Sequence, residues 1–190
     1  MKKNYTFSGY NNKVDLSDLD EEITFVEKGS PCGELLRRYW QPVILSEELG
    51  KLPKLVKILD EELVIFRDKS GQVGLLDKHC SHRGASLEYG IIADCGLICS
   101  YHGWHFDIDG TLLKAGSEPC KSPVHKRVKH GAYQTYEYEG IIFAYLGPPE
   151  KTPEFPLYDT QTNNDLLKVP FTIETPCNWL QVYENTQDPI

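Results

Sequence analysis

The sequence has 190 residues, which is enough for one ordinary domain or for one domain and part of a second. Its 28 acidic residues outnumber its 20 lysines and arginines, and the formal net charge of −8 disfavours a nucleic-acid partner. The start, Met1 to Tyr5, has no apolar segment behind its lysines, and no apolar run approaches membrane-spanning length. We therefore expect a cytoplasmic protein with no membrane anchor.

The first 30 residues are polar and acidic, which predicts an N-terminal arm that is extended or forms a short helix. A helix is expected next, from Pro31 to Tyr39, followed by an extended run from Trp40. Turn residues such as Asp109-Gly110 and Glu139-Gly140 then separate short apolar or alternating runs. These runs predict strands at 55–59, 63–67, 73–76, 96–98, 104–108, 111–113, 133–138 and 141–145. Many short strands at close spacing predict a mainly β, antiparallel domain over residues 31–147.

A domain boundary is predicted at Gly147-Pro148-Pro149, because prolines remove backbone donors and interrupt regular structure. Two further prolines follow closely, and we assign residues 148–164 to a linker. Residues 165–190 then form a separate segment. In it, Leu166–Ile173 is expected to be a strand, and a helix is expected to start near Asn178, a possible N-cap residue.

Four residues in the β domain have the spacing of metal ligands. Cys80 and His82 form one pair and Cys99 and His102 form a second, with sixteen residues between the pairs. In a Rieske-type [2Fe–2S] cluster, two thiolates hold one iron and two imidazoles hold the other. Neutral imidazoles in place of thiolates raise the reduction potential, so this arrangement suits single-electron transfer.

A Cys2His2 zinc site would use the same four residue types. Structural zinc sites more often place both cysteines in one short knuckle and both histidines in a later pair, whereas here each pair is mixed. Zinc therefore stays open as the lesser alternative. The remaining cysteines, Cys32, Cys95, Cys120 and Cys177, are expected to be free thiols.

Four further histidines do not fit the ligand spacing. His79 and His105 flank the ligand pairs and are interpreted as ordinary loop or strand residues. His125 and His130 belong to a basic stretch around Lys121–Lys129, which predicts a solvated loop rather than a ligand set.

The residues around the ligands resemble those of the Rieske non-haem iron oxygenases. The first loop contains His82-Arg83-Gly84-Ala85 followed by Leu87, and the second reads Cys99-Ser100-Tyr101-His102-Gly103-Trp104, followed by Phe106-Asp107. The resemblance implies an antiparallel β domain that carries the cluster at one tip, between two hairpin loops. It also implies that Cys80, His82, Cys99 and His102 are the cluster ligands.

The last segment is similar to the entry into the catalytic domain of these oxygenases, in the phthalate-dioxygenase-like branch. Asn178, Trp179, Glu184 and Asn185 match the family pattern, and Asp188 stands at the position of an aspartate that links the cluster to a mononuclear iron. The resemblance therefore implies the start of an α+β catalytic domain. No histidine follows His130, so the two iron-binding histidines of the family are missing. We expect the N-terminal part of a longer oxygenase, or a truncated product.

For the whole enzyme, the resemblance implies hydroxylation or demethylation of an aromatic or cyclic, acidic substrate with O2. An NAD(P)H-dependent reductase of flavin or ferredoxin type would supply the electrons. Transfer between subunits would require a homo-oligomer, with a trimer favoured. The competing hypotheses are a stand-alone Rieske ferredoxin, which carries electrons without catalysis, and a zinc-stabilised binding module.

Overall fold

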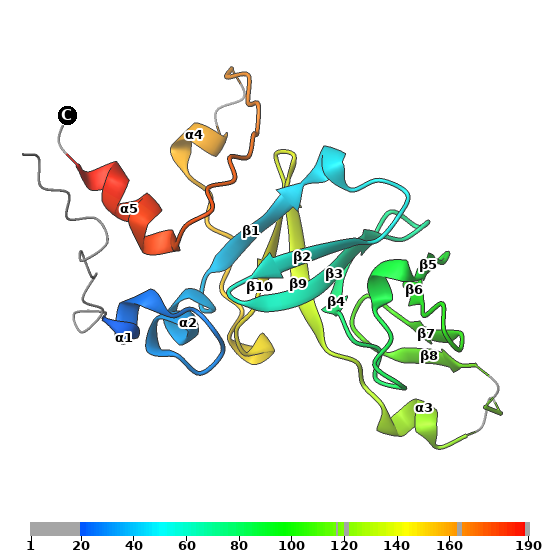
Figure 1. The fold of residues 1–190 in the computed structure, drawn as a ribbon. Helices are drawn as coiled ribbons and strands as arrows, with labels where there is room; N and C mark the ends of the chain where they lie inside the picture. Colours follow the sequence, from blue (N-terminus) through cyan, green and yellow to red (C-terminus); the bar gives the residue numbers. More distant parts are fainter. Residues whose placement is uncertain (1–19, 117, 120–121, 163–164, 189–190) are drawn as a thin grey trace, which may run out of the picture.

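The computed structural model describes residues 20–116, 118–119, 122–162 and 165–188 (Figure 1). In these ranges the strands form two antiparallel sheets, which confirms the predicted mainly β fold. The larger sheet has the order β1-β10-β9-β4-β3-β2, and its strands are Trp40–Leu45 (β1), Lys54–Ile58 (β2), Glu61–Arg67 (β3), Val73–Asp77 (β4), Ala132–Tyr138 (β9) and Ile141–Tyr145 (β10). The smaller sheet has the order β5-β6-β7-β8, with strands Ile91–Ile92, Leu97–Ile98, Trp104–Phe106 and Leu112–Ala115.

Short helices connect and flank the two sheets. The α-helices are Glu21–Thr24 (α1), Pro31–Leu36 (α2), Val124–Arg127 (α3), Asp159–Thr162 (α4) and Trp179–Gln187 (α5). The 3₁₀ helices are Ser46–Glu48 (η2), Leu87–Tyr89 (η3) and Pro149–Lys151 (η4). Helix α2 ends at Leu36, earlier than the predicted Tyr39, and β1 begins at Trp40, where the extended run is expected. In the part of the chain that the structure describes, no helix has the length and apolar character needed to span a bilayer.

Both predicted hairpin turns are confirmed. Gly110 and Gly140 have positive φ angles of 79°, a region that glycine adopts without a steric cost. The Asp109 carboxylate accepts a hydrogen bond from the Thr111 amide at 2.8 Å, which closes the turn between β7 and β8. Glycine at these two turns therefore sets where the strands reverse.

The core has two parts, one on either side of β3. Leu63 and Ile65 pack against the first part, with Ile44, Leu75 and Ile142. Val64 and Phe66 pack into the second part, which also contains Cys80, Cys99 and residues of the small sheet. Because successive side chains of a strand point to opposite faces, β3 contributes to both parts and joins the two sheets.

The proline-rich segment packs against the large sheet. Trp40 Nε1 donates a hydrogen bond to the Pro153 carbonyl at 3.1 Å. Phe155 contacts the rings of Trp40, Tyr136 and Phe143 at centroid distances of 5.9, 4.5 and 4.9 Å. The segment that the sequence identifies as a linker is thus held in place by aromatic contacts.

The predicted strand Leu166–Ile173 is wrong for this structure. The backbone there is irregular and pairs with no strand among the described residues, and Leu167 is 92% exposed. The predicted helix start is confirmed, because the Asn178 side chain caps α5 by accepting a hydrogen bond from the Leu180 amide at 2.9 Å. Asn178 and Trp179 also donate to the carbonyls of Thr24 and Ile23, so α5 lies beside α1.

Candidate metal centre

The four predicted ligands lie on two loops that have the same internal hydrogen bonds. In the first loop, between β4 and η3, the Cys80 amide donates to the Ala85 carbonyl at 2.9 Å and the Gly84 amide donates to the Cys80 carbonyl at 2.8 Å. In the second loop, between β6 and β7, the corresponding bonds join Cys99 to Trp104 at 2.7 Å and Gly103 to Cys99 at 3.0 Å. Each loop is therefore a tight turn that begins at a cysteine and presents a histidine.

Gly84 and Gly103 have positive φ angles of 71° and 69°. An added Cβ at either position would meet no protein atom within 4 Å. The backbone conformation, rather than a close contact within the protein, accounts for glycine at these two positions.

The two cysteines form the inner part of the site. Cys80 and Cys99 are each 3% exposed and pack in the same core cluster. Burial raises the pKa of the Cys80 thiol to about 11, and hydrogen bonding with the Cys99 side chain adds to this effect. The two sulfurs are thus neighbours in an apolar environment, where a bound cation would be needed to stabilise thiolates.

The two histidines form the outer part. Their ring centroids are 4.8 Å apart, and the rings meet edge to face at 67°. His82 also stacks on Trp104 with a centroid distance of 4.6 Å and an interplanar angle of 4°. Burial lowers the pKa of His82, and the neighbouring His102 and Arg83 lower it further. A neutral imidazole is the form that binds a metal.

This arrangement fits a two-iron cluster. Two buried thiols are adjacent to each other and two imidazoles are adjacent to each other, as a cluster with two cysteine and two histidine ligands requires. In the described part of the chain, no three His, Cys, Asp or Glu side chains converge on a point where a single ion would bind. The four donors therefore lie as a pair of buried thiols and a pair of adjacent imidazoles.

Asp188 lies far from these four residues. It is exposed and follows the last turn of α5. Figure 1 shows α5 and the small sheet at opposite ends of the molecule. Within one chain the structure thus brings four of the five predicted site residues together and leaves Asp188 apart.

The prediction of a solvated loop is wrong for His130, which is 3% exposed and contacts the first ligand loop through Ser81. No local sequence signal marks this contact, because the two residues are 49 positions apart. The described cysteines outside the site, Cys32, Cys95 and Cys177, are free thiols as predicted, and Cys120 lies outside the described residues.

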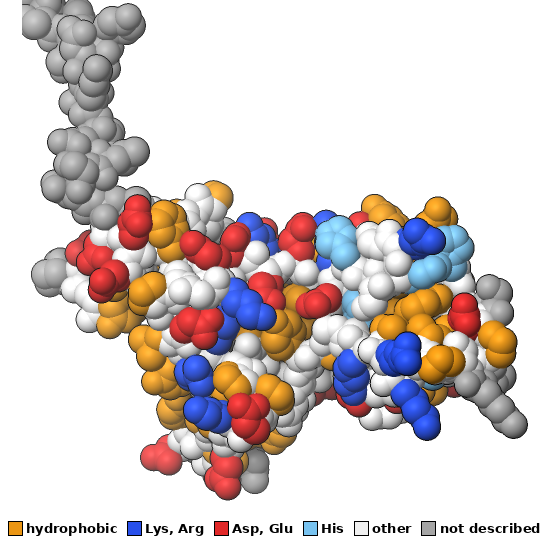
Figure 2. Space-filling model, turned by 90° about the horizontal axis from the view of Figure 1, so that it is seen from below, with side chains coloured by type: hydrophobic (Ala, Val, Ile, Leu, Met, Phe, Trp, Pro, Cys, Tyr) orange, Lys and Arg blue, Asp and Glu red, His pale blue; other side chains and the backbone are white. Residues whose placement is uncertain are grey.

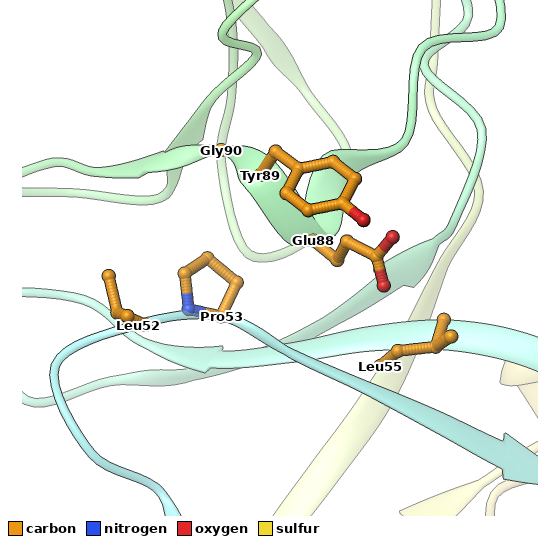
Figure 3. Close-up of a pocket in the computed structure, with 6 residues that line it drawn as sticks. All are labelled: Leu52, Pro53, Leu55, Glu88, Tyr89 and Gly90. Atoms are coloured by element: carbon orange, nitrogen blue, oxygen red, sulfur yellow. The ribbon is translucent and has the colours of Figure 1, made fainter.

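The surroundings of the loops are partly apolar and partly basic. Figure 2 shows histidine side chains grouped with lysine or arginine side chains at the end of the molecule that carries the small sheet. A shallow groove separates this end from the large sheet (Figure 3), with Glu88 and Tyr89 of η3 on one side and Leu52, Pro53 and Leu55 on the other. The groove lies beside η3, which follows the first ligand loop, and none of the four predicted ligands lines it.

Comparison with known families agrees with this geometry. Residues 39–137 match the family model of the Rieske [2Fe–2S] domain. The chain therefore belongs to the Rieske family, and its cofactor is a [2Fe–2S] cluster. Within that family it lies with the alpha subunits of Rieske oxygenases, in the phthalate-dioxygenase-like branch.

Two relatives illustrate the similarity. The chain is 48% identical over 185 residues to the oxygenase subunit of tert-butanol monooxygenase / tert-amyl alcohol desaturase from Aquincola tertiaricarbonis, covering 96% of this chain and 39% of the relative. It is 43% identical over 187 residues to the phenoxybenzoate dioxygenase alpha subunit from Ectopseudomonas oleovorans, covering 90% and 45%. The chain thus spans less than half the length of these relatives.

Solved structures show the same fold. Dicamba monooxygenase bound to dicamba aligns with a TM-score of 0.58 at 27% identity, over 74% of this chain and 42% of that chain. NdmA of Pseudomonas putida CBB5, solved as a QL mutant with theobromine, aligns with a TM-score of 0.60 at 28% identity, over 70% and 40%.

Proposed function

We propose that Cys80, His82, Cys99 and His102 hold the [2Fe–2S] cluster and that the chain is the electron-transfer part of a Rieske oxygenase. The observation that carries the ligand assignment is the pairing of two buried thiols and two adjacent imidazoles on matched loops. When bound, the cluster accepts and donates one electron at a time.

The protein's own residues prepare the site for this role. The backbone N–H groups of His82 and Arg83 donate hydrogen bonds to the Cys80 sulfur, and such bonds tune a cluster's potential. Trp104 covers one face of His82, while His102 is exposed. The exposed imidazole edge is therefore the side from which a partner exchanges electrons with the site.

We assign residues 1–30 to an arm, 31–147 to the Rieske domain, 148–164 to a linker and 165–190 to the start of a catalytic domain. In the whole oxygenase, a mononuclear Fe(II) would be held by residues that are not part of this sequence. Asp188 is proposed to connect that iron to the cluster of a neighbouring subunit, within a homo-oligomer and most simply a trimer. The distance of α5 from the ligand loops within one chain supports transfer between subunits (Figure 1).

The proposed electron source is an NAD(P)H-dependent reductase of flavin or ferredoxin type, and the proposed location is the cytoplasm. Residues 78–131, which carry the ligands, contain seven Lys or Arg and five Asp or Glu, although the chain as a whole has a net charge of −8. This basic segment suits an acidic electron donor. The exposed free thiols of Cys95 and Cys177 fit a reducing compartment.

The proposed reaction is hydroxylation or demethylation of an aromatic or cyclic, acidic substrate with O2. Relatives named for phenoxybenzoate, phthalate and dehydrodivanillate support an aromatic acid. The relative named for tert-butanol shows that substrates in this group of proteins extend beyond aromatic acids. A stand-alone ferredoxin is disfavoured because the similarity to oxygenase subunits extends over 96% of the chain.

The first test is the iron and acid-labile sulfide content of the purified chain, with an EPR spectrum after dithionite reduction. Two irons, two sulfides and a rhombic signal are expected. Cys80→Ala should lose the cluster, whereas Cys32→Ala, a matched change at a buried cysteine outside the site, should keep it. Zinc in place of iron would contradict the proposal.

Asp188 is tested in an oxygenase that carries this chain together with the iron-binding histidines. Asp188→Asn should leave reduction of the cluster intact and abolish product formation coupled to it. Glu174→Gln, a matched change at another exposed carboxylate, should leave turnover unchanged. Full activity of the Asp188 variant would remove this residue from the electron path.

A further inference from the structure

His130 is buried and bonded at both ring nitrogens. Its Nε2 lies 2.9 Å from the Asp77 carbonyl oxygen, and its Nδ1 lies 2.6 Å from Ser81 Oγ. The ring also stacks on Phe106 with a centroid distance of 4.6 Å and an interplanar angle of 28°. A histidine outside the ligand motif is thus fixed by contacts with three different parts of the fold.

The two hydrogen bonds determine where the ring proton lies. A carbonyl oxygen only accepts, so Nε2 must carry the hydrogen and donate to Asp77. In the neutral ring, Nδ1 is then an acceptor, and Ser81 Oγ–H donates to it. Burial lowers the pKa of His130, which agrees with a neutral ring, although the Asp77 carbonyl and charge oppose this shift.

We infer that His130 is a positioning residue for the [2Fe–2S] site, because it anchors Ser81, the residue between the ligands Cys80 and His82. This inference rests on the ligand assignment proposed above. The backbone bonds of the loop join its ends, Cys80, Gly84 and Ala85, whereas the Ser81–His130 bond joins its middle to the core. The anchor thus limits movement of the Cys80 sulfur and the His82 ring together.

The strand under the site supports the same interpretation. Trp104 and Phe106 lie two residues apart on β7, and both side chains pack in the core cluster that contains Cys80 and Cys99. Trp104 stacks on His82 and Phe106 stacks on His130, so one strand supports both the ligand and its anchor. Together with the Ser81–His130 bond, these two stacking contacts hold the first loop against β7.

The second loop has no such anchor. Ser100 follows Cys99 as Ser81 follows Cys80, but its side chain is exposed and has no hydrogen-bond partner among the described residues. The two loops, otherwise alike, thus differ in how their middles are held. The anchored loop carries the more buried imidazole, His82, and the unanchored loop carries the exposed one, His102.

The test compares substitutions at both ends of the Ser81–His130 bond, in the 190-residue chain with its cluster assembled. Ser81→Ala removes the donor, and His130→Gln removes the acceptor while keeping an amide that reaches toward Asp77. His130→Asn places an oxygen near the position of Nδ1 and is the rescue variant. His105→Gln is the matched control, since the His105 side chain hydrogen-bonds the Cys95 carbonyl at 2.5 Å, which lies outside both ligand loops. The readouts are the midpoint potential, the EPR g-values and the rate of iron release to a chelator.

We expect Ser81→Ala and His130→Gln to release iron about tenfold faster, the typical effect of losing a contact behind a metal ligand. Both should change the g-values and the potential in the same direction. The double variant should show no further change, and His130→Asn should return toward the parent protein. The His105 control should match the parent in all three readouts.

If Ser81→Ala has the parent potential, g-values and iron-release rate, the inference is overturned. Ser81 is exposed, so this variant is expected to fold even if His130→Gln does not. The ligand proposal fails separately, when the parent chain itself contains no two-iron, two-sulfide centre. A parent chain with the Rieske signal beside an unchanged Ser81→Ala variant would overturn only the role of His130.

Discussion

Replacing Arg37 with methionine tests the buried ion pair that ties α2 to the large sheet. Arg37 is 2% exposed, and its guanidinium donates to Glu61 Oε1 from Nη2 at 2.7 Å and from Nε at 3.2 Å. It also donates to the carbonyl oxygens of Val26, Gly33 and Leu59 at 2.8, 3.2 and 2.9 Å. Methionine fills a similar volume but leaves the Glu61 carboxylate and all three carbonyls without this donor.

Removing one partner of a buried ion pair costs about 3–5 kcal/mol, because the other charge is left poorly solvated. The Glu61 side chain is 20% exposed and still accepts a hydrogen bond from the Tyr133 hydroxyl, so we expect the lower end, about 3 kcal/mol. In a chain of this size, 1 kcal/mol moves the unfolding midpoint by roughly 2–4 °C, so we expect a decrease of roughly 6–12 °C. The control is Arg67→Met. Arg67 binds Glu137 with two bonds of 2.9 Å, but the two side chains are 28% and 39% exposed. An exposed pair contributes only about 0–1 kcal/mol.

The assay is thermal unfolding of the cluster-loaded chain, followed by circular dichroism and by the visible absorption of the cluster. The midpoint potential should stay at the parent value in both variants, since neither arginine contacts a ligand loop. Equal destabilisation by Arg37→Met and Arg67→Met would refute the reasoning, because burial would then not decide the cost. In Arg37→Met/Glu61→Gln, part of the lost stability should return.

Three further changes test the small sheet and its junction. Burial favours a raised pKa for the Asp68 carboxyl, but hydrogen bonds from Ser70, Gly96 and Gln72 outweigh it and lower the pKa below its usual 3.8. The stabilisation is therefore fully present above about pH 4 and is lost as the pH falls through the lowered pKa, so the difference in urea unfolding between Asp68→Asn and the parent should be largest at pH 7 and should shrink as the pH falls below 4. Gly96→Ala should destabilise by about 2 kcal/mol or more in the same assay, because φ is 70° and a Cβ would lie 2.0 Å from the Phe106 carbonyl oxygen. Trp104→Leu removes the ring that stacks on His82 and should change the EPR g-values, whereas Trp104→Phe should keep them close to the parent; identical spectra for both would show that the stacking has no effect on the site.

Much of the site could be predicted because its chemistry is local in the sequence. Cys80 and His82 are two residues apart, and Cys99 and His102 are three apart. Each pair of candidate ligands is therefore visible as a short local motif. The hairpin turn at Gly110 can also be predicted from its own residues, since glycine after aspartate favours the positive φ that the turn requires. Features that depend on a few neighbouring residues are the ones that a single sequence specifies.

Features that depend on distant partners could not be predicted in the same way. The alternating apolar residues of 166–173 have the period of a strand, but a strand also needs a neighbour to pair with, and periodicity does not supply one. The basic neighbours of His130 predict a solvated loop. The composition of a segment does not determine whether one of its side chains is buried. The His130 ring can be buried because Ser81 and Asp77 satisfy both its nitrogens.

Strand β3 shows why the packing behind the metal centre is harder to predict from the sequence than the candidate ligands are. Residues 63–66 are four consecutive apolar residues, each at most 1% exposed, as expected for a strand covered on both faces. Val64 and Phe66 lie in the core cluster that contains Cys80 and Cys99, and Phe66 packs so closely that a Cβ on its partner Gly74 would lie 2.5 Å from the ring. The core cluster that contains the two thiols therefore packs against one face of a strand whose other face packs in the second part of the core. A loop motif is enough to propose which residues bind the cluster, whereas the packing on both faces of β3 that lies behind them involves residues distant in the sequence.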